Sequence, residues 1–225
     1  MNALFITGTD TEVGKTVLTT ALVAYWQTYC SRSLGIMKPI QAGVGDRELY
    51  LQLFDLDQSI AEITPLYFNA PLAPPIAAAK EDRAVDLAPV WQTLQKLTAT
   101  RDFVLIEALG GLGSPVTDEF TVADLAAEWR LPTVLVVPVK LGAISQAVAN
   151  VALARQSHIH LKGIVLNCVQ PHSTPEIAEL APQELIQSLT NVAVLGCIPY
   201  LENCTDIAKL AQIAAALELE RLLPL

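Results

Sequence analysis

The chain has 225 residues, of which 52% are hydrophobic and 16% are charged, and this favours a single folded domain over a disordered chain. Its 23 acidic and 14 basic residues leave a net charge of −9, which argues against a nucleic-acid binder, because such a protein needs a basic face. No apolar run reaches the ~18 residues of a transmembrane helix, and the opening MNALFITG lacks the features of a secretory signal. We therefore expect a cytoplasmic protein without a membrane partner.

Short apolar runs alternate with longer helical patterns along the chain. The runs predict strands at 3–8, 34–39, 103–108, 133–139, 163–169 and 192–198. The patterns between them predict helices at 15–29, 45–55, 86–98, 121–129, 143–156, roughly 175–188 and 206–219. Each run is rich in Val, Ile and Leu on both faces, as in a parallel strand covered by helices on both sides. The order predicts one α/β domain, residues 1–225, with a parallel sheet between helices.

Two further features are interpreted structurally. Residues 59–75 contain four prolines, and we expect an ordered loop there. The cysteines form no C-x-x-C pair, so we expect reduced, mostly buried thiols at Cys30, Cys168, Cys197 and Cys204.

The first predicted strand is followed by GTDTEVGKT, in which Gly14, Lys15 and Thr16 open a helix. Loop amides and the positive helix N-terminus there would hold a triphosphate. Lys15 would reach the β- and γ-phosphates, and the Thr16 hydroxyl would bind Mg²⁺. Five residues separate Gly8 from Gly14, one more than in the standard phosphate-binding loop (P-loop). The pattern still predicts a phosphate-binding site.

Charged residues follow the next strands. Lys38 stands at the end of a strand in MKPIQAG, either in the ligand crevice or as a solvated strand-end lysine. Glu107 ends the buried run FVLI, where a carboxylate is costly unless it is paired or bound to a cation. An acid at that place, opposite a P-loop, is a typical Mg²⁺ partner. Asp46 begins a predicted helix, where the helix dipole favours an acid.

Two later positions allow a structural and a functional interpretation. Gly142 and Ala143 begin a helix whose free amides suit a carboxylate, although an ordinary strand–helix joint looks the same. Asn167 ends the run GIVLN, where it could cap a turn or pair with adenine. The histidines His158, His160 and His172 lack metal-ligand spacing, and we interpret them as surface or loop residues.

The segments GTDTEVGKT, MKPIQAG, IEALGG, VKLG and GCIP occur in the order found in the dethiobiotin synthetases, and the chain resembles that family from residue 3 to about 205. The resemblance implies a P-loop NTPase-like fold and an ATP- and Mg²⁺-dependent ligase of biotin synthesis. In that reaction 7,8-diaminopelargonate and CO₂ form a carbamate, ATP phosphorylates it, and ring closure gives dethiobiotin, ADP and phosphate. The resemblance also implies a homodimer with the substrate site at its interface.

Residue roles follow from the resemblance. Lys15 and Lys38 would be catalytic, and Thr16, Asp46 and Glu107 would hold the metal. The substrate would be bound by Thr11, Lys38, Gly142 and Ala143. The residues implied to bind ATP are Glu12, Val13, Gly14, Lys15, Thr16, Val17, Asp46, Glu107, Gly110, Asn167, Cys168, Pro199, Tyr200 and Leu201.

The chain departs from the family pattern at two places. Ala42 stands where the family usually has Ser or Thr, and Ala108 and Leu109 interrupt the pattern E-G-A-G-G. Three other functions stay open: a cobyrinate-type synthetase, a nucleotide-switch ATPase and a regulatory nucleotide-binding domain. The chain is too short for the glutaminase domain of the first and lacks the early P-loop lysine of the second, while Lys38 and the acids argue against the third.

Overall fold

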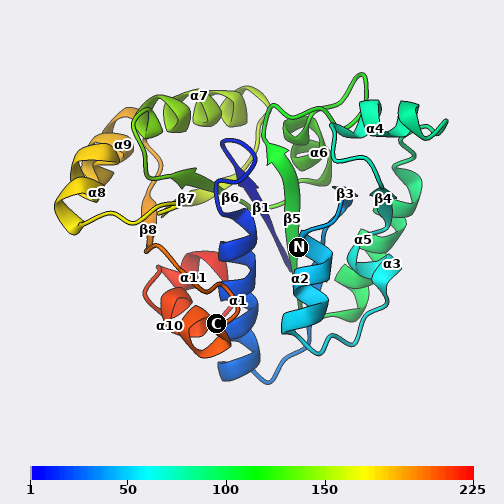
Figure 1. Cartoon of the computed structure of the whole chain (residues 1–225), viewed down its shortest axis with the longest axis horizontal. Coiled ribbons are helices and arrows are strands. Elements are labelled where there is room, and N and C mark those ends of the chain that lie inside the picture. The colour runs from blue at the N-terminus through cyan, green and yellow to red at the C-terminus, as the bar shows by residue number, and fades with distance from the viewer. Residues whose placement is uncertain (1) are drawn as a thin grey trace.

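The computed structural model describes residues 2–225 and contains a six-stranded sheet in the order β2-β5-β1-β6-β7-β8 (Figure 1). Every neighbouring pair of these strands is parallel. The strands are β1 (Ala3–Gly8), β2 (Leu34–Met37), β5 (Phe103–Gly111), β6 (Thr133–Pro138), β7 (Leu161–Asn167) and β8 (Val194–Ile198). The predicted parallel α/β architecture is confirmed.

Helices cover both faces of the sheet, and the side chains of β1 alternate between the two. Leu4 and Ile6 enter a core shared with α1 (Lys15–Tyr29) and α10 (Ile207–Ala215), which pack against each other. Ala3 and Phe5 enter the opposite core. That core includes residues of α4 (Pro74–Lys80), α5 (Ala88–Thr100) and α6 (Val122–Trp129). A third cluster fills the space between the sheet and α7 (Ala143–Gln156) and α9 (Gln183–Thr190).

The prediction of a loop at residues 59–75 was wrong. The segment contains α3 (Ile60–Ile63), β4 (Leu66–Phe68) and the first residues of α4. Ser59 and Glu62 form a capping box that starts α3. Strand β4 pairs in parallel with β3 (Ile40–Ala42) in a separate two-stranded sheet, which the sequence analysis did not predict.

The helix predicted at 175–188 is also two helices. They are α8 (Thr174–Leu180) and α9, and Pro182 stands between them. Proline lacks an amide hydrogen and restricts the residue before it, so a continuous helix cannot pass this point. The last predicted helix likewise ends early, as α10, and is followed by α11 (Leu219–Leu222).

All four cysteines are free, as expected, but the expectation that most are buried was wrong. Only Cys168 is buried, and the other three are half-buried. Within residues 2–225 no helix is both long and apolar enough to cross a membrane.

Candidate active site

The P-loop connects β1 to α1 and depends on a glycine at residue 14. Gly14 is the N-cap of α1 with φ 100° and ψ 24°, a conformation that favours glycine. A Cβ built on Gly14 would lie 2.0 Å from Nδ2 of Asn167. That Nδ2 donates a hydrogen bond to the Val13 carbonyl oxygen at 3.0 Å. The end of β7 therefore holds the P-loop against the sheet.

The order of the strands brings the predicted polar residues together. Strand β5 lies between β2 and β1, and Glu107 is paired with Ile6 of β1. Lys38 follows β2 on one side of Glu107, and the P-loop follows β1 on the other. Glu107 lies inside β5 rather than at its end, because the strand continues to Gly111, beyond its predicted limit.

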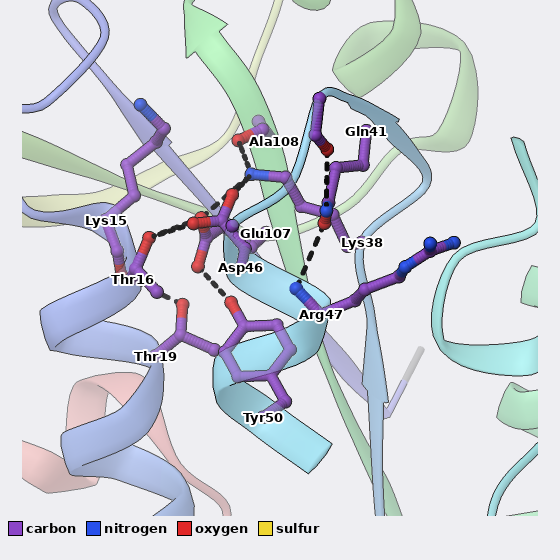
Figure 2. A network of polar contacts seen from close by, with 12 residues as sticks. Lys15, Thr16, Thr19, Lys38, Gln41, Asp46, Arg47, Tyr50, Glu107 and Ala108 are labelled. Atoms are coloured by element: carbon purple, nitrogen blue, oxygen red, sulfur yellow. Dashed lines mark hydrogen bonds and ion pairs between the residues drawn. The ribbon is translucent and has the colours of Figure 1, made fainter. Parts of the chain in front are cut away.

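A hydroxyl and two carboxylates converge at this edge of the sheet (Figure 2). The Thr16 Oγ1 lies 2.8 Å from Oδ1 of Asp46 and 2.9 Å from Oε1 of Glu107. Asp46 begins α2 (Asp46–Leu53), which carries it to the cluster. These are oxygen donors of the kind that Mg²⁺ prefers, and few protein ligands suffice when phosphates and water complete its shell. The residues present therefore fit a magnesium ion.

Lys38 contacts the same two acids. Its Nζ donates to Oε1 of Glu107 at 2.9 Å and to the Ala108 carbonyl oxygen at 3.2 Å, and it also forms an ion pair with Asp46 (Figure 2). Burial alone would lower the pKa of Lys38, but the negative charges of Glu107 and Asp46 raise it above its ordinary value. Burial tends to raise the pKa of Asp46, yet the Lys38 charge brings it below its ordinary value. Both groups are therefore ionised at neutral pH.

Lys15 is the second cation, and it is also buried. Its Nζ donates to the carbonyl oxygen of Asp10 at 2.9 Å, within the same loop. Burial, with a further contribution from the charge of Lys38, lowers the pKa of Lys15 to about 8. A negative ligand would stabilise the charged form of this lysine, since opposite charges favour ionisation.

Tyr50 is a member of the cluster that the sequence analysis missed. It is fully buried, and its hydroxyl donates a hydrogen bond to Oε2 of Glu107 (Figure 2). Burial, followed by the charge of Glu107, raises the pKa of Tyr50 well above its ordinary value, so the hydroxyl stays a donor. The available signal was its spacing: Tyr50 follows Asp46 by four residues, which puts both on one face of a helix.

A cavity of about 750 Å³ opens over this cluster. Its wall opposite the P-loop includes Ala42, Pro71 and Leu72. The predicted site residues that line the cavity are Thr11, Glu12, Gly14, Lys15, Thr16, Lys38, Asp46, Glu107 and Gly110. The cavity therefore unites both predicted lysines with all three predicted metal ligands.

The other predicted ATP residues do not line this cavity. Val13 is buried and Val17 half-buried, both against the core shared with α1. Asn167 and Cys168 are buried at the end of β7. Pro199, Tyr200 and Leu201 follow β8, and of these three only Leu201 is buried. The sheet order separates β8 from β1 by two strands, so this group lies on the far side of the P-loop from Lys38.

Gly142 and Ala143 begin α7, as the sequence predicted, but neither lines the cavity. Gly142 is the N-cap, with φ 94°, and Ala143 is fully buried. The preceding Leu141 is 89% exposed. One turn into α7, Oε1 of Gln146 lies 3.3 Å from the Thr9 hydroxyl, so this helix contacts the P-loop of its own chain.

Comparison with known proteins identifies the family. The chain matches the family model described as an AAA domain over residues 2–208. It is 62% identical over 226 residues to the ATP-dependent dethiobiotin synthetase BioD of Gloeothece citriformis, covering 100% of both chains. The dethiobiotin synthetase of Synechocystis sp. is 51% identical, over 97% of this chain and 94% of that one. The dethiobiotin synthetase of Bacillus subtilis strain 168 is 30% identical, over 91% of this chain and 90% of that one.

Solved structures of other P-loop proteins share the fold. A ParA family ATPase from Chlorobium tepidum superposes with a TM-score of 0.56 at 10% identity, over 99% of this chain and 92% of that one. The cell division protein MinD of Aquifex aeolicus also gives 0.56, at 15% identity over 95% and 89% of the two chains. Identities this low show the fold alone, whereas the full-length matches above are much closer. The chain therefore belongs to the family of ATP-dependent dethiobiotin synthetases.

Proposed function

We propose that the protein converts 7,8-diaminopelargonate, CO₂ and ATP into dethiobiotin, ADP and phosphate. A carbamate forms on one amine, and its oxygen attacks the γ-phosphorus as the bond to ADP breaks. The second amine then attacks the resulting carbamic-phosphoric anhydride, closes the ring and releases phosphate. The observation that carries the proposal is the meeting of Lys15, Thr16, Lys38, Asp46 and Glu107 at a single cavity.

The metal role rests on the oxygen cluster. Thr16, Asp46 and Glu107 would hold Mg²⁺, which when bound would neutralise charge on the β- and γ-phosphates. The Thr16 hydroxyl is within hydrogen-bond distance of both acids, and the three residues come from three separate elements: α1, α2 and β5. The P-loop amides and Lys15 would then cradle the phosphates from the other side.

Lys38 would stabilise the transferring phosphoryl group and the carbamate oxygen. Phosphoryl transfer requires positioning and charge neutralisation more than a strong base. The support is that Lys38 is charged, buried and at the cavity wall, next to Asp46 and Glu107, the two acids among the predicted metal ligands. Two of its three present partners are carboxylates, so its ammonium group is already directed at the place where the metal and the phosphates would meet.

The adenine is assigned to the far side of the P-loop. Asn167 uses one amide hydrogen to hold Val13, while its Oδ1 accepts no hydrogen bond from the described part of the chain. An amide with a free acceptor and a second N–H suits the donor and acceptor edge of adenine. Cys168, Pro199, Tyr200 and Leu201 would line the same subsite.

The diaminopelargonate is assigned to the cavity, with Thr11 and Lys38 at its amine end. Its carboxylate tail would meet the α7 N-terminus at Gly142 and Ala143 of a partner subunit in a homodimer. Two facts support the shared site: neither residue lines the cavity of its own chain, and Leu141 beside them is 89% exposed. We also keep the cytoplasm as the predicted location.

The proposed activity is tested by phosphate release from ATP with and without diaminopelargonate and bicarbonate, with dethiobiotin measured by mass spectrometry. We expect phosphate and dethiobiotin in equal amounts, and release that depends on the diamine. Phosphate release at the same rate without the diamine would instead indicate a nucleotide-switch ATPase. Nucleotide binding without any release would indicate a regulatory domain.

The shared site is tested separately by light scattering on Leu141→Glu. A charge at the interface should convert a dimer of about twice the chain mass into a monomer and raise KM for the diamine. Leu189→Glu is the matched control, because Leu189 is an exposed leucine on α9 at the edge of the fold. A fully active monomer would contradict the placement of the carboxylate at Gly142 and Ala143.

A further inference from the structure

Tyr50 is the one phenol in the polar cluster, and its hydroxyl donates a hydrogen bond to Glu107. It lies four residues after Asp46 on α2, so the same face of the helix presents a carboxylate and a phenol. Asp46 contacts Thr16 and Lys38 at the cavity. Tyr50 is fully buried in the core that also contains Leu18 of α1 and Phe54. The ring is therefore held by packing, and its hydroxyl has a fixed position.

The two oxygens of Glu107 have different partners. Oε1 lies 2.9 Å from the Thr16 hydroxyl and 2.9 Å from Nζ of Lys38. Oε2 accepts the hydrogen bond from Tyr50. A glutamate carboxylate rotates easily about its last side-chain bond, whose rotamer wells are broad. The Tyr50 hydroxyl restricts that rotation, and Oε1 is the oxygen that stays directed toward Thr16.

We propose that Tyr50 is a positioning residue for the magnesium site and acts through Glu107. By holding Oε2, it keeps Oε1 directed at Thr16 and the phosphates before the metal arrives. Partners that orient a metal ligand in this way commonly change metal affinity by about 10–100-fold when they are removed. The inference rests on the proposed role of Glu107 as a magnesium ligand.

A purely structural role makes a different prediction. If Glu107 only satisfied a buried phenol, the loss of the hydroxyl would lower stability and leave metal binding unchanged. The distinguishing measurement is therefore the affinity for magnesium, taken apart from catalysis. ADP binding provides it, because ADP can be titrated without metal and again at a series of Mg²⁺ concentrations.

The test compares Tyr50→Phe with Tyr25→Phe. Tyr25 is half-buried on α1 and packs against the tilted ring of Tyr29, with ring centroids 4.9 Å apart, so it controls for the loss of a phenol elsewhere. For Tyr50→Phe we expect unchanged ADP affinity without metal, and a Mg²⁺ concentration for half-maximal tightening of ADP raised by about tenfold. Tyr25→Phe should match the wild type in both. An unchanged magnesium requirement in a folded Tyr50→Phe protein would overturn the proposal, as would an equal loss of ADP affinity with and without metal.

A double-mutant cycle with Glu107→Gln checks the route of the effect. If Tyr50 acts through Glu107, Tyr50→Phe should add little once Glu107 is Gln, since coupled residues are not additive. Additive effects on the magnesium requirement would overturn the proposal. Glu107→Gln alone tests the assumption that Glu107 is a magnesium ligand. If this variant has the wild-type magnesium requirement, Glu107 is not in the metal site and the proposed role of Tyr50 fails. That outcome is independent of the result of the phosphate-release assay. If Tyr50→Phe does not fold, Tyr50→Met provides the same comparison without a donor.

Discussion

Gly14 and Gly142 form a natural pair for separating backbone strain from a specific clash. Both are N-caps of helices that follow a strand, and their φ angles are 100° and 94°. A Cβ at Gly142 would meet nothing within 4 Å, whereas a Cβ at Gly14 would lie 2.0 Å from Nδ2 of Asn167. Replacing each by alanine therefore imposes a similar strain, and only one of them displaces a neighbour.

The expected magnitudes follow from these contacts. Alanine in the left-handed region costs about 1–2 kcal/mol, which is the whole effect expected for Gly142→Ala. At Gly14 the Asn167 side chain must also move and give up its buried hydrogen bond to Val13, which adds about 1–3 kcal/mol. We therefore expect Gly14→Ala to lose roughly 2–5 kcal/mol in total.

Urea unfolding of the two variants measures the stability difference, and ADP titration measures its functional consequence. Gly14→Ala should weaken ADP binding, because the loop amides around Lys15 move with Val13. Gly142→Ala should keep the wild-type ADP affinity, because Gly142 belongs neither to the P-loop nor to the residues assigned to adenine. Equal stability losses in the two variants, or normal ADP binding by Gly14→Ala, would refute the idea that Asn167 holds the P-loop in its binding conformation.

Three further predictions concern single charged residues. Glu107→Gln should lower the rate of phosphate release by about 10²–10³-fold. The free energy of unfolding should fall by only about 1–3 kcal/mol, because Lys38 keeps its ion pair with Asp46. An unchanged rate at saturating Mg²⁺ would remove Glu107 from the site. Lys38→Ala should lower kcat with little change in nucleotide affinity, and a normal kcat with a raised KM for ATP would make Lys38 a binding residue instead. Burial raises the pKa of Glu48, but hydrogen bonds from the Gly45 amide, Arg47 and Gln41 outweigh that effect. Together they lower the pKa from 4.5 to about 2. Because the pKa of Glu48 is lower in the folded state, its stabilisation of the fold is complete above pH 4.5 and is lost as the pH falls toward 2. Glu48→Gln should therefore make Tm fall less steeply between about pH 5 and 3. A parallel fall of Tm in the variant and the wild type would contradict this prediction.

The sequence was sufficient for the parts of the fold and site that depend on local pattern. Apolar runs located all six strands of the main sheet, and the residues that follow β1 and β2 carry the P-loop and Lys38. The carboxyl ends of parallel strands meet at one edge of a sheet, so the residues that follow these strands were expected at the ligand crevice. The contact of Lys38 with Glu107 depends on the position of β5 between β2 and β1, which the sequence analysis did not predict.

Features that depend on short elements or on distant contacts were not predicted. Strands β3 and β4 have three residues each, too few for a two-residue alternation to be recognised. Tyr50 was overlooked because an aromatic residue on a short helix is typical of a core position, and its partner is 57 residues away. The contact of Asn167 with Val13 spans 154 residues, and no local pattern reports such a distance.

The arrangement of charges explains how the site can be stable without a ligand and still accept one. Lys15 and Lys38 balance Asp46 and Glu107, so the buried charges are compensated within the protein. Mg²⁺ and ATP would bring a cation and several phosphate anions to the same cluster. The carboxylates would then have a divalent partner in place of Lys38. Lys38 would have phosphate oxygens in place of a carboxylate, and Lys15 would have them in place of the Asp10 carbonyl. Each charged group would exchange one polar or charged partner for another, so none would pass through an unpaired state, whose cost is several kcal/mol. The same exchange would free Lys38 for the phosphoryl group once the metal is bound, which would couple the activation of this lysine to metal binding.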